Sequence, residues 1–315
     1  MIHFDDSATQ RFLEQWGNSQ PFIEAHTSGS TGTPKIIRLS KNDMVASATA
    51  TCEYFGINAS SVMVCPLSAD YIAGKMMIVR AIVSGATLYM ELPSNNPLLT
   101  DYPELDLVPI VPSQLPGLVN SIRKKQVKNV IIGGAPLSAT AEAAIERVPF
   151  KAFATYGMTE TCSHVALRII GNHNNVYEAL PGYTLGIDNR SCLIINSSTQ
   201  SFGQIVTNDV VTLVDERHFV WKGRYDNVII SGGLKVHPEI VEKTISKHIN
   251  RELYISAGVD AKWGQRVILN IEGPEFDTEE LLSALRMELK AHELPREIIF
   301  HDCFSRTKSG KIIRT

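Results

Sequence analysis

The stretch "HTSGSTGTPKIIRLSKNDMVASATATCEYF", residues 26–55, joins a glycine- and hydroxyl-rich loop to a short apolar strand and then to a helix. Ser40 followed by Asp43 is a capping pattern that starts a helix, and apolar residues recur after it at helical spacing. We therefore predict a helix over 41–55. A loop between two plain strands needs only a few residues, so we expect the longer loop over 26–35 to wrap a ligand.

The same alternation of strands and helices continues outward from this stretch. Further strands are predicted at 62–67, 86–90, 106–111, 129–134 and 152–157, and helices at 71–85, where Gly85 stops the helix, and from Ser113 and Ser138. Strand–helix–strand repetition implies a mostly parallel sheet covered by helices. The fold class is therefore predicted to be α/β, or α+β over the whole chain.

After Glu160 the pattern changes to short β runs broken by Gly, Asn and Asp. These runs, at 164–170, 184–188, 191–197, 204–214 and 218–223, predict a small antiparallel sheet or a distorted barrel. A third segment begins near Asp226, with a helix at 237–249, strands at 252–259, 266–273 and 297–303, and a helix at 278–291 that Asp277 and Glu280 would cap. We place a domain boundary there, giving a large domain, residues 1–225, and a small, mobile α+β domain, residues 226–315.

Composition excludes several classes of function. The 315 residues carry 30 basic and 33 acidic side chains, a net charge of −3, which gives no field for nucleic acid. The basic run 122–128 follows an apolar segment and is expected to end a helix, where cations suit the helix dipole. The five cysteines are scattered, with no disulfide or zinc spacing, and no apolar stretch is long enough for membrane insertion. A cytoplasmic protein is expected.

The loop over 27–35 has the chemistry of a polyphosphate site. Gly29 and Gly32 allow close backbone approach, the hydroxyl side chains between them donate hydrogen bonds, and Lys35 adds a compact positive charge. The spacing differs from that of the usual P-loop, because only two residues separate the glycines. The alternative is a flexible surface turn.

Two other clusters follow predicted strands. "TYGMTET", residues 155–161, places an aromatic ring, a glycine, hydroxyls and Glu160 at the carboxyl end of a strand, where open α/β sheets bind ligands. Its groups could stack a base and hold magnesium through one carboxylate. "GGAP", residues 133–136, ends a neighbouring strand in the same way. The alternatives are an exposed strand corner and an ordinary βα turn.

Two weaker signals lie further along the chain. Asp209 in "TND" and Arg224 in "GRYD" could hold ribose hydroxyls, although Asn-Asp and Gly also form ordinary hairpin turns. The tail "TKSGKIIR" carries Lys311 beside a glycine. A basic tail is usually solvated and mobile, so Lys311 matters only if the small domain can bring it to a cleft.

Taken together and in this order, these residues resemble the adenylate-forming superfamily of acyl-CoA synthetases, peptide-synthetase adenylation domains and luciferases. The resemblance spans residues 27–314 and implies catalytic roles for Lys311, Thr159 and Glu160, the last also as a magnesium ligand. It implies a hinge at Asp226 and a thioester-stage loop at Gly232 and Gly233. It implies ATP contacts at Thr27, Ser28, Gly29, Ser30, Thr31, Gly32, Lys35, Gly133, Gly134, Ala135, Tyr156, Gly157, Met158, Asp209 and Arg224.

The chain departs from the superfamily in two places. Only about 26 residues precede the phosphate loop, so we expect an N-terminus that is short relative to the family, and the aspartate motif has Asn where Gly is usual. The short N-terminus, with Ser163 and His164 after the magnesium motif, resembles the o-succinylbenzoate–CoA ligases of menaquinone synthesis. That acid has a second, unreacted carboxylate, for which Lys75 or Arg80 could be the partner; a structural role is the alternative for each of these residues.

The resemblance implies ATP, magnesium and CoA as ligands and a small-molecule carboxylic acid as the substrate. The acid would attack the α-phosphorus of ATP, and a thiol would then displace AMP. Two other functions stay open. The chain could load an acid onto a carrier protein, or it could be a nucleotide-binding protein without catalysis; retention of Lys35, Glu160 and Lys311 together argues against the second.

Overall fold

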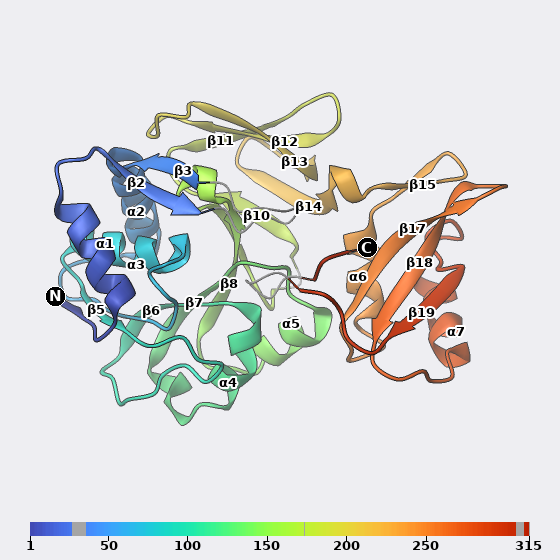
Figure 1. The fold of residues 1–315 in the computed structure, drawn as a ribbon, viewed down its shortest axis with the longest axis horizontal. Coiled ribbons are helices and arrows are strands. Elements are labelled where there is room, and N and C mark those ends of the chain that lie inside the picture. Colours follow the sequence, from blue (N-terminus) through green and yellow to red (C-terminus); the bar gives the residue numbers. More distant parts are fainter. Residues whose placement is uncertain (27–35, 173, 307–311, 315) are drawn as a thin grey trace.

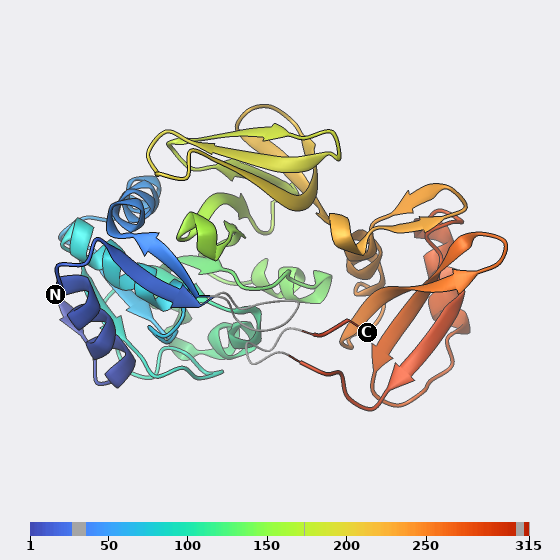
Figure 2. The same ribbon diagram turned by 45° about the horizontal axis from the view of Figure 1, so that its top comes forward.

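Two main sheets organise the chain, and a two-stranded hairpin accompanies the larger one (Figure 1). The computed structural model describes residues 1–26, 36–172, 174–306 and 312–314. Within them, twelve strands form the large sheet and five form the second sheet, which lies to the right in Figure 1. Turning the molecule brings the β11–β13 layer forward and shows the second sheet standing to one side (Figure 2).

The first half of the large sheet is parallel, as predicted. Its strands, in spatial order, are β1 (Ile2–His3), β5 (Thr87–Met90), β4 (Val62–Cys65), β6 (Leu105–Ile110), β7 (Val127–Ile132) and β8 (Lys151–Gly157). Each neighbouring pair in this half is parallel. The carboxyl ends of β7 and β8 therefore meet at one edge, the usual ligand-binding edge of such sheets.

The helices of this half begin and end where local signals place them. They are α1 (Ser7–Gly17), α2 (Lys41–Phe55), α3 (Ile72–Ser84), α4 (Leu115–Asn120) and α5 (Ala139–Ile145). The predicted helix over 41–55 is confirmed, and its cap Ser40 accepts a hydrogen bond from the Asp43 amide at 3.4 Å. The Asp43 carboxylate does not complete the capping box, because it accepts from the amide and hydroxyl of Ser201. Gly85, at a φ of 73°, ends α3 as expected.

Two helix predictions after β6 were wrong in detail. The segment from Ser113 forms a short 3₁₀ turn, η1 (Pro112–Gln114), before α4 begins. The basic run does not end a helix: it forms its own 3₁₀ turn, η2 (Ile122–Gln126), and enters β7. The reason is Ser121, whose extended backbone stops α4 and whose hydroxyl accepts from the Arg123 amide at 3.2 Å.

The second half of the large sheet is antiparallel and continues the same hydrogen-bonded path. Beyond β8 the order is β9 (His164–Ile169), β10 (Val176–Ala179), β14 (His218–Arg224), β13 (Gln204–Leu213), β12 (Cys192–Ser197) and β11 (Tyr183–Ile187). The small β-rich part is therefore an extension of the large sheet. Separately, β2 (Phe22–His26) and β3 (Ile36–Ser40) form the antiparallel hairpin.

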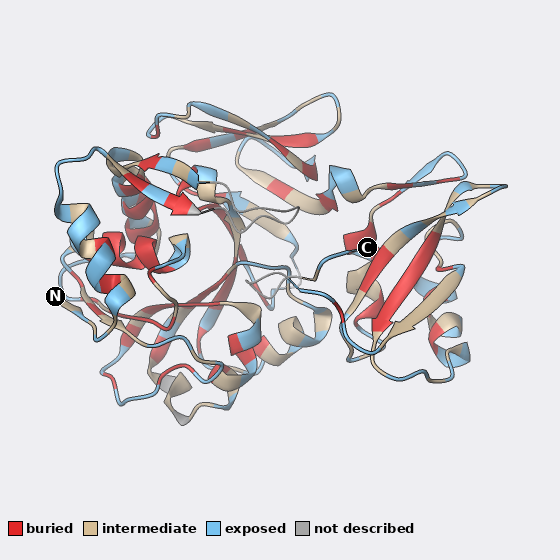
Figure 3. Ribbon diagram, viewed as in Figure 1, coloured by how far each residue is buried: buried red, intermediate tan, exposed pale blue. Residues whose placement is uncertain are grey.

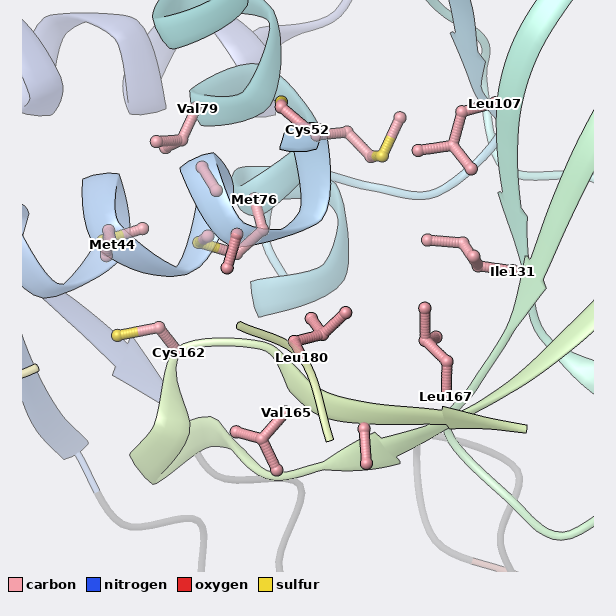
Figure 4. Close-up of a cluster of buried hydrophobic side chains, with 14 of the residues drawn as sticks. Met44, Cys52, Met76, Val79, Leu107, Ile131, Cys162, Val165, Leu167 and Leu180 are labelled. Carbon is pink, nitrogen blue, oxygen red and sulfur yellow. The ribbon is translucent and has the colours of Figure 1, made fainter. Parts of the chain in front are cut away.

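The core of the large unit lies where α2 and α3 pack on the sheet. Buried residues colour both helices and the central strands in Figure 3. The close-up in Figure 4 shows Met44 and Met76 on the helices, with Val165 and Leu180 across from them and Leu107 at the other side of the same cluster. All five side chains are fully buried, and each buried Leu or Met contributes roughly 1.5–3 kcal/mol to stability.

The second sheet has its own core and two helices. Its strands are β15 (Ile229–Ser231), β16 (Leu234–Val236), β17 (Leu253–Asp260), β18 (Gly264–Glu272) and β19 (Glu297–His301), covered by α6 (Pro238–Ile245) and α7 (Glu279–Glu288). Both helices are shorter than predicted. The cap prediction for α7 was wrong: Thr278 is the N-cap, while Asp277 accepts from the Glu279 amide at 3.0 Å. No helix in the described ranges is long and apolar enough to cross a membrane.

Candidate active site

Eight of the predicted site residues lie outside the described residues. They are Thr27, Ser28, Gly29, Ser30, Thr31, Gly32 and Lys35 of the loop, and Lys311 of the tail. The strands that flank the loop are described. His26, the last residue of β2, pairs with Ile36, the first residue of β3, so the two ends of segment 27–35 meet at one end of the hairpin.

The parallel sheet brings two predicted clusters together. Gly133, Gly134 and Ala135 follow β7, and Tyr156 and Gly157 end β8, the next strand in the sheet. Ile132, the last residue of β7, pairs with Ala154 of β8. Both clusters therefore lie at the carboxyl edge, as the sequence predicted for a ligand site.

Asp209 is the centre of a hydrogen-bonded group beside this edge. Its buried carboxylate accepts from the Tyr156 hydroxyl at 2.7 Å and from the Trp221 indole at 3.1 Å. The Arg224 guanidinium lies 3.8 Å from the same carboxylate. Because each carboxylate oxygen can accept more than one hydrogen bond, the group retains acceptor capacity for ligand hydroxyls.

Tyr156 is held as a neutral hydrogen-bond donor. Burial, the charge of Asp209 and the hydrogen bond to it raise the pKa of Tyr156 well above its ordinary value. Its ring packs edge-on against Phe219 and Tyr177. The phenol is therefore protonated at neutral pH and fixed in one orientation.

The predicted hinge residue lies between the two sheets. Asp226 is in the 3₁₀ turn η4 (Tyr225–Asn227), which follows β14 of the large sheet and precedes β15 of the second sheet. Asp226 accepts from the Asn208 side chain at 3.3 Å, and Arg224 lies 3.5 Å from its carboxylate. Arg224 therefore stands between Asp209 and Asp226.

A short 3₁₀ turn carries the predicted magnesium ligand. In η3 (Thr159–Thr161), the Thr161 hydroxyl donates to the carbonyls of Met158 and Ser163 and so fixes the turn. Glu160 is exposed. The described residues contain no group of three or more acidic, His or Cys side chains that could hold a metal. One carboxylate still fits magnesium, which usually takes one or two carboxylates and completes its shell with phosphates and water.

A buried arginine lies directly behind this turn. The Arg80 guanidinium, only 2% exposed, donates to the Ser163 hydroxyl at 2.5 Å and contacts the Met77 sulfur at 3.4 Å. Its Nε has no partner among the described groups, and no carboxylate of the described residues pairs with it. His164 lies 3.3 Å from Ser163 through Nδ1 and 3.2 Å from the Thr51 hydroxyl through Nε2.

The charge of this cluster resides on Arg80. Burial lowers the pKa of Arg80 to about 10, so the guanidinium still carries its charge at neutral pH. Burial and the nearby Arg80 charge lower the pKa of His164 well below its ordinary value, so the imidazole is neutral. A buried cation without an acidic partner is costly, and a ligand carboxylate is the group that would compensate it.

The structure does not bring Lys75 into this cluster. Its ammonium donates to the Ala69 carbonyl at 2.6 Å and lies 5.2 Å from the centre of the Phe12 ring. Lys75 therefore faces α1, while Arg80, five residues later on α3, faces Ser163. The two cations considered from the sequence therefore do not share one site.

Glycine is required where the end of β8 meets the segment that carries Ser163 and His164. Gly157 pairs with His164 at a bulge between β8 and β9, and a Cβ at Gly157 would lie 2.3 Å from the Ser163 carbonyl oxygen. This close approach joins the carboxyl edge of β8 to the Arg80 cluster. At the other predicted loop, Gly232 and Gly233 form the β15–β16 turn with φ values of 60° and 78°, which side chains rarely adopt.

The model of the family described as "AMP-binding enzyme" matches residues 6–219. This chain belongs to the AMP-binding enzyme family. A 2-succinylbenzoate–CoA ligase from Listeria monocytogenes serovar 1/2a is 25% identical, over 98% of this chain and 72% of the relative. An indoleacetate–CoA ligase from Aromatoleum aromaticum is 23% identical, over 95% of this chain and 67% of the relative.

Solved structures of AMP-binding enzymes confirm the predicted fold class. An acyl-CoA synthetase (AMP-forming)/AMP-acid ligase II-like protein from Dyadobacter fermentans has a TM-score of 0.66 and 32% identity, covering 97% of this chain and 91% of that one. An o-succinylbenzoate CoA synthetase (MenE) from Bacillus subtilis, in complex with the acyl-adenylate OSB-AMP, has a TM-score of 0.82 and 21% identity, covering 92% and 67%.

Sequence reasoning missed one residue of this AMP-binding enzyme's candidate site. Trp221 donates to Asp209, yet nothing in the sequence separates it from the other two tryptophans. The available signal was general: a buried aspartate in a strand needs donors. That rule indicates that a partner exists without saying which residue it is.

Proposed function

We propose that this chain is an ATP-dependent acyl-CoA ligase that forms an acyl-adenylate and then a CoA thioester, with o-succinylbenzoate as its acid. Membership of the AMP-binding enzyme family supports the reaction class. Relatives named 2-succinylbenzoate–CoA ligase, matching nearly the whole chain, support the acid. A cytoplasmic location and a place in menaquinone synthesis are parts of the same proposal.

The observation that carries the choice of acid is the buried Arg80 without an acidic partner among the described residues. o-Succinylbenzoate has two carboxylates. One would be activated at the nucleotide, and the other needs a cation inside the acyl pocket. Arg80, which donates to Ser163 beside the β8–β9 bulge, would supply that cation.

In the first half-reaction the acid carboxylate would attack the α-phosphorus of ATP. No general base is needed, because a carboxylic acid with a pKa of about 4 is already ionised at neutral pH. The task is electrostatic, since one anion must approach another. By family resemblance, the loop over 27–35 and Lys311 would neutralise the phosphates. Magnesium, when bound through Glu160, would add positive charge there.

The described residues would hold the nucleoside. Asp209 keeps acceptor capacity for two ribose hydroxyls, and the Tyr156 and Trp221 donors fix its carboxylate. Gly133 and Gly134, at the end of β7, would let the backbone approach the base. Arg224 would complete the polar side of the pocket.

In the second half-reaction CoA would attack the acyl-adenylate and AMP would leave. By family resemblance, the small domain, residues 226–315, rotates about Asp226 against the large domain, residues 1–225. Rotation would remove Lys311 and bring the Gly232–Gly233 turn to the cleft. The position of Asp226 between the two sheets supports this assignment.

A pyrophosphate-release assay with a panel of carboxylic acids tests the proposal. We expect o-succinylbenzoate to give the highest kcat/KM, with AMP and an acyl-CoA as products when CoA is present, and Lys311→Ala to abolish exchange. Response only to fatty or amino acids would refute the choice of acid. Exchange without turnover of free CoA would indicate a carrier protein as acceptor, and ATP binding without exchange by any acid would refute catalysis.

A further inference from the structure

Five residues of α2, α3 and the segment that enters β9 form one chain of hydrogen bonds. The Arg80 guanidinium lies 2.5 Å from the Ser163 hydroxyl, which lies 3.3 Å from Nδ1 of His164. Nε2 of His164 lies 3.2 Å from the Thr51 hydroxyl, and this hydroxyl donates to the Ser47 carbonyl at 3.2 Å. We call this set of contacts the Arg80 chain.

The two ends of the Arg80 chain fix the direction of every bond in it. A carbonyl only accepts, so the Thr51 hydroxyl donates its hydrogen to Ser47 and can only accept from His164. A guanidinium only donates, so the Ser163 hydroxyl accepts from Arg80 and keeps its hydrogen for His164. Both ends therefore require the same imidazole, in which Nε2 carries the hydrogen and Nδ1 accepts.

Any other state of the imidazole loses a bond of the chain. With the hydrogen on Nδ1, the imidazole and Arg80 would both donate to the Ser163 hydroxyl. The Thr51 hydroxyl could then bond either Nε2 or the Ser47 carbonyl, but not both. An imidazolium would leave the Ser163 hydrogen without its acceptor. Burial and the nearby Arg80 charge lower the pKa of His164, which keeps the imidazole neutral as the chain requires.

The backbone at Ser163 is fixed as well as its hydroxyl. The Ser163 carbonyl accepts from the Thr161 hydroxyl at 2.7 Å, in the turn that carries Glu160. Between them, Cys162 has a φ of 63°, in the left-handed region that residues other than glycine rarely adopt. Such a conformation costs free energy, persists only where the surroundings impose it, and is concentrated at functional sites.

The Arg80 chain determines which donors of the guanidinium stay available. Ser163 accepts from one nitrogen, and the Met77 sulfur, a weak acceptor, lies 3.4 Å from another. Nε has no partner among the described groups. A cation that is already held in place loses less side-chain freedom when an anion binds, so holding the guanidinium strengthens binding.

We propose that the Arg80 chain holds the guanidinium in position for the second carboxylate of the acid substrate and fixes His164 as the Nε2–H tautomer. Ser163, His164 and Thr51 are then positioning residues, which act through Arg80 and not on the reacting atoms. The inference rests on the proposed function, because it assigns the chain to recognition of a dicarboxylate.

The tautomer of His164 is measured by ¹⁵N NMR of the ligand-free protein. Long-range ¹H–¹⁵N spectra of ¹⁵N-histidine-labelled protein distinguish the two tautomers and the imidazolium. Signals that disappear in His164→Gln assign this residue among the nine histidines. We expect a hydrogen on Nε2 alone at neutral pH. A hydrogen on Nδ1 alone, or on both nitrogens, would overturn the inference.

Thr51→Val and Thr51→Ser test whether the chain serves binding of the acid. Valine keeps the shape of the side chain but cannot bond His164, whereas serine keeps the hydroxyl. Losing one hydrogen bond should raise the KM for o-succinylbenzoate about 2- to 12-fold in Thr51→Val, with the KM for ATP within about twofold. The KM for an analogue with hydrogen in place of the unreacted carboxylate should stay the same. Thr51→Ser should recover most of the loss.

Thr9→Val is the matched control. Thr9 of α1 is as fully buried as Thr51, and its hydroxyl also makes a side-chain hydrogen bond, to Asp6 at 2.6 Å, outside the Arg80 chain. Only Thr51→Val should change the ratio of the KM for o-succinylbenzoate to the KM for the analogue. An unchanged ratio in Thr51→Val, or the same change of ratio in Thr9→Val, would overturn the inference.

The same assays separate failure of this inference from failure of the proposed function. If the unmodified protein does not use o-succinylbenzoate, the proposed function fails and this inference fails with it. If the unmodified protein uses this acid and Thr51→Val keeps the ratio of the two KM values, only this inference fails.

Discussion

Replacing Arg80 by methionine tests separately how its buried charge affects protein stability and how it affects binding of the acid substrate. Methionine keeps most of the length and apolar volume of the side chain but has no charge. Burial lowers the pKa of Arg80 from 12.5 to about 10, and a shift of this size corresponds to about 3 kcal/mol held against the charged form. We expect Arg80→Met to raise the free energy of unfolding by up to that amount, which urea denaturation measures.

The same change should damage binding of a dicarboxylate. A hydrogen bond to a charged group contributes about 1.5–3 kcal/mol, so the KM for o-succinylbenzoate should rise roughly 10- to 150-fold. An analogue with hydrogen in place of the unreacted carboxylate should show almost no change in KM. The assay is pyrophosphate release with each acid at saturating ATP.

Lys75→Met is the matched control for Arg80→Met. It removes a second buried cation from the same helix, but one that contacts the Ala69 carbonyl and the Phe12 ring. Lys75→Met should leave the ratio of the KM for o-succinylbenzoate to the KM for the analogue as it is in the unmodified protein. The assignment of Arg80 would be refuted if Arg80→Met changed the KM for both acids equally. It would also be refuted if Lys75→Met changed the ratio of the two KM values as Arg80→Met does. A less stable Arg80→Met protein would refute the account of its buried charge.

Three further outcomes follow from other contacts. Trp221→Phe removes one donor to Asp209, so the KM for ATP should rise about fivefold, and an unchanged KM would contradict a role in ribose binding. Lys243→Met breaks a 3.1 Å ion pair with Glu142 that joins α6 to α5 and would favour one arrangement of the two domains. The rates of pyrophosphate exchange and thioester formation should therefore shift about two- to fivefold in opposite directions, and shifts in the same direction would argue against this role of the ion pair. Burial lowers the pKa of His164, so below pH 6.5 the unfolded chain binds a proton that the folded chain does not. The contribution of His164 to the free energy of unfolding should be complete above pH 6.5 and fall as the pH drops, by at most about 1.4 kcal/mol per pH unit. Urea unfolding of His164→Gln between pH 7.5 and 5.5 should show a flatter dependence on pH.

Local signals in the sequence predicted the elements whose ends depend on nearby residues. The ends of α2 follow from Ser40 and the left-handed Gly56, and Gly85 ends α3. One cap prediction was wrong because a distant residue competes for the same group. Asp43 does not complete the capping box because Ser201, far along the chain, takes both carboxylate oxygens. No local pattern contains that information.

The candidate site at the carboxyl edge of the parallel strands was predictable only in part. The order of parallel strands places Gly133 and Tyr156 at the same edge, and a strand–helix alternation is enough to expect this. The Asp209 group was not predictable in full. Its Trp221 donor lies past a bulge, where Val210 pairs with Gly223 but Val211 pairs with Trp221. One extra residue in a strand reverses which face the following side chains occupy, and the sequence does not show where that residue is.

The two cations of α3 show where sequence reasoning stops and packing decides. Successive helical residues turn by about 100°, so Lys75 and Arg80, five apart, point about 140° away from each other. Helical geometry alone therefore excludes both facing one pocket, and the sequence could have shown that a choice was necessary. It could not make the choice, because both residues lie in one apolar run and both are buried. The contacts decide it: Lys75 contacts a carbonyl and an aromatic face. Among the described residues the Arg80 guanidinium contacts only the Ser163 hydroxyl and a sulfur, and so keeps the capacity for an anion.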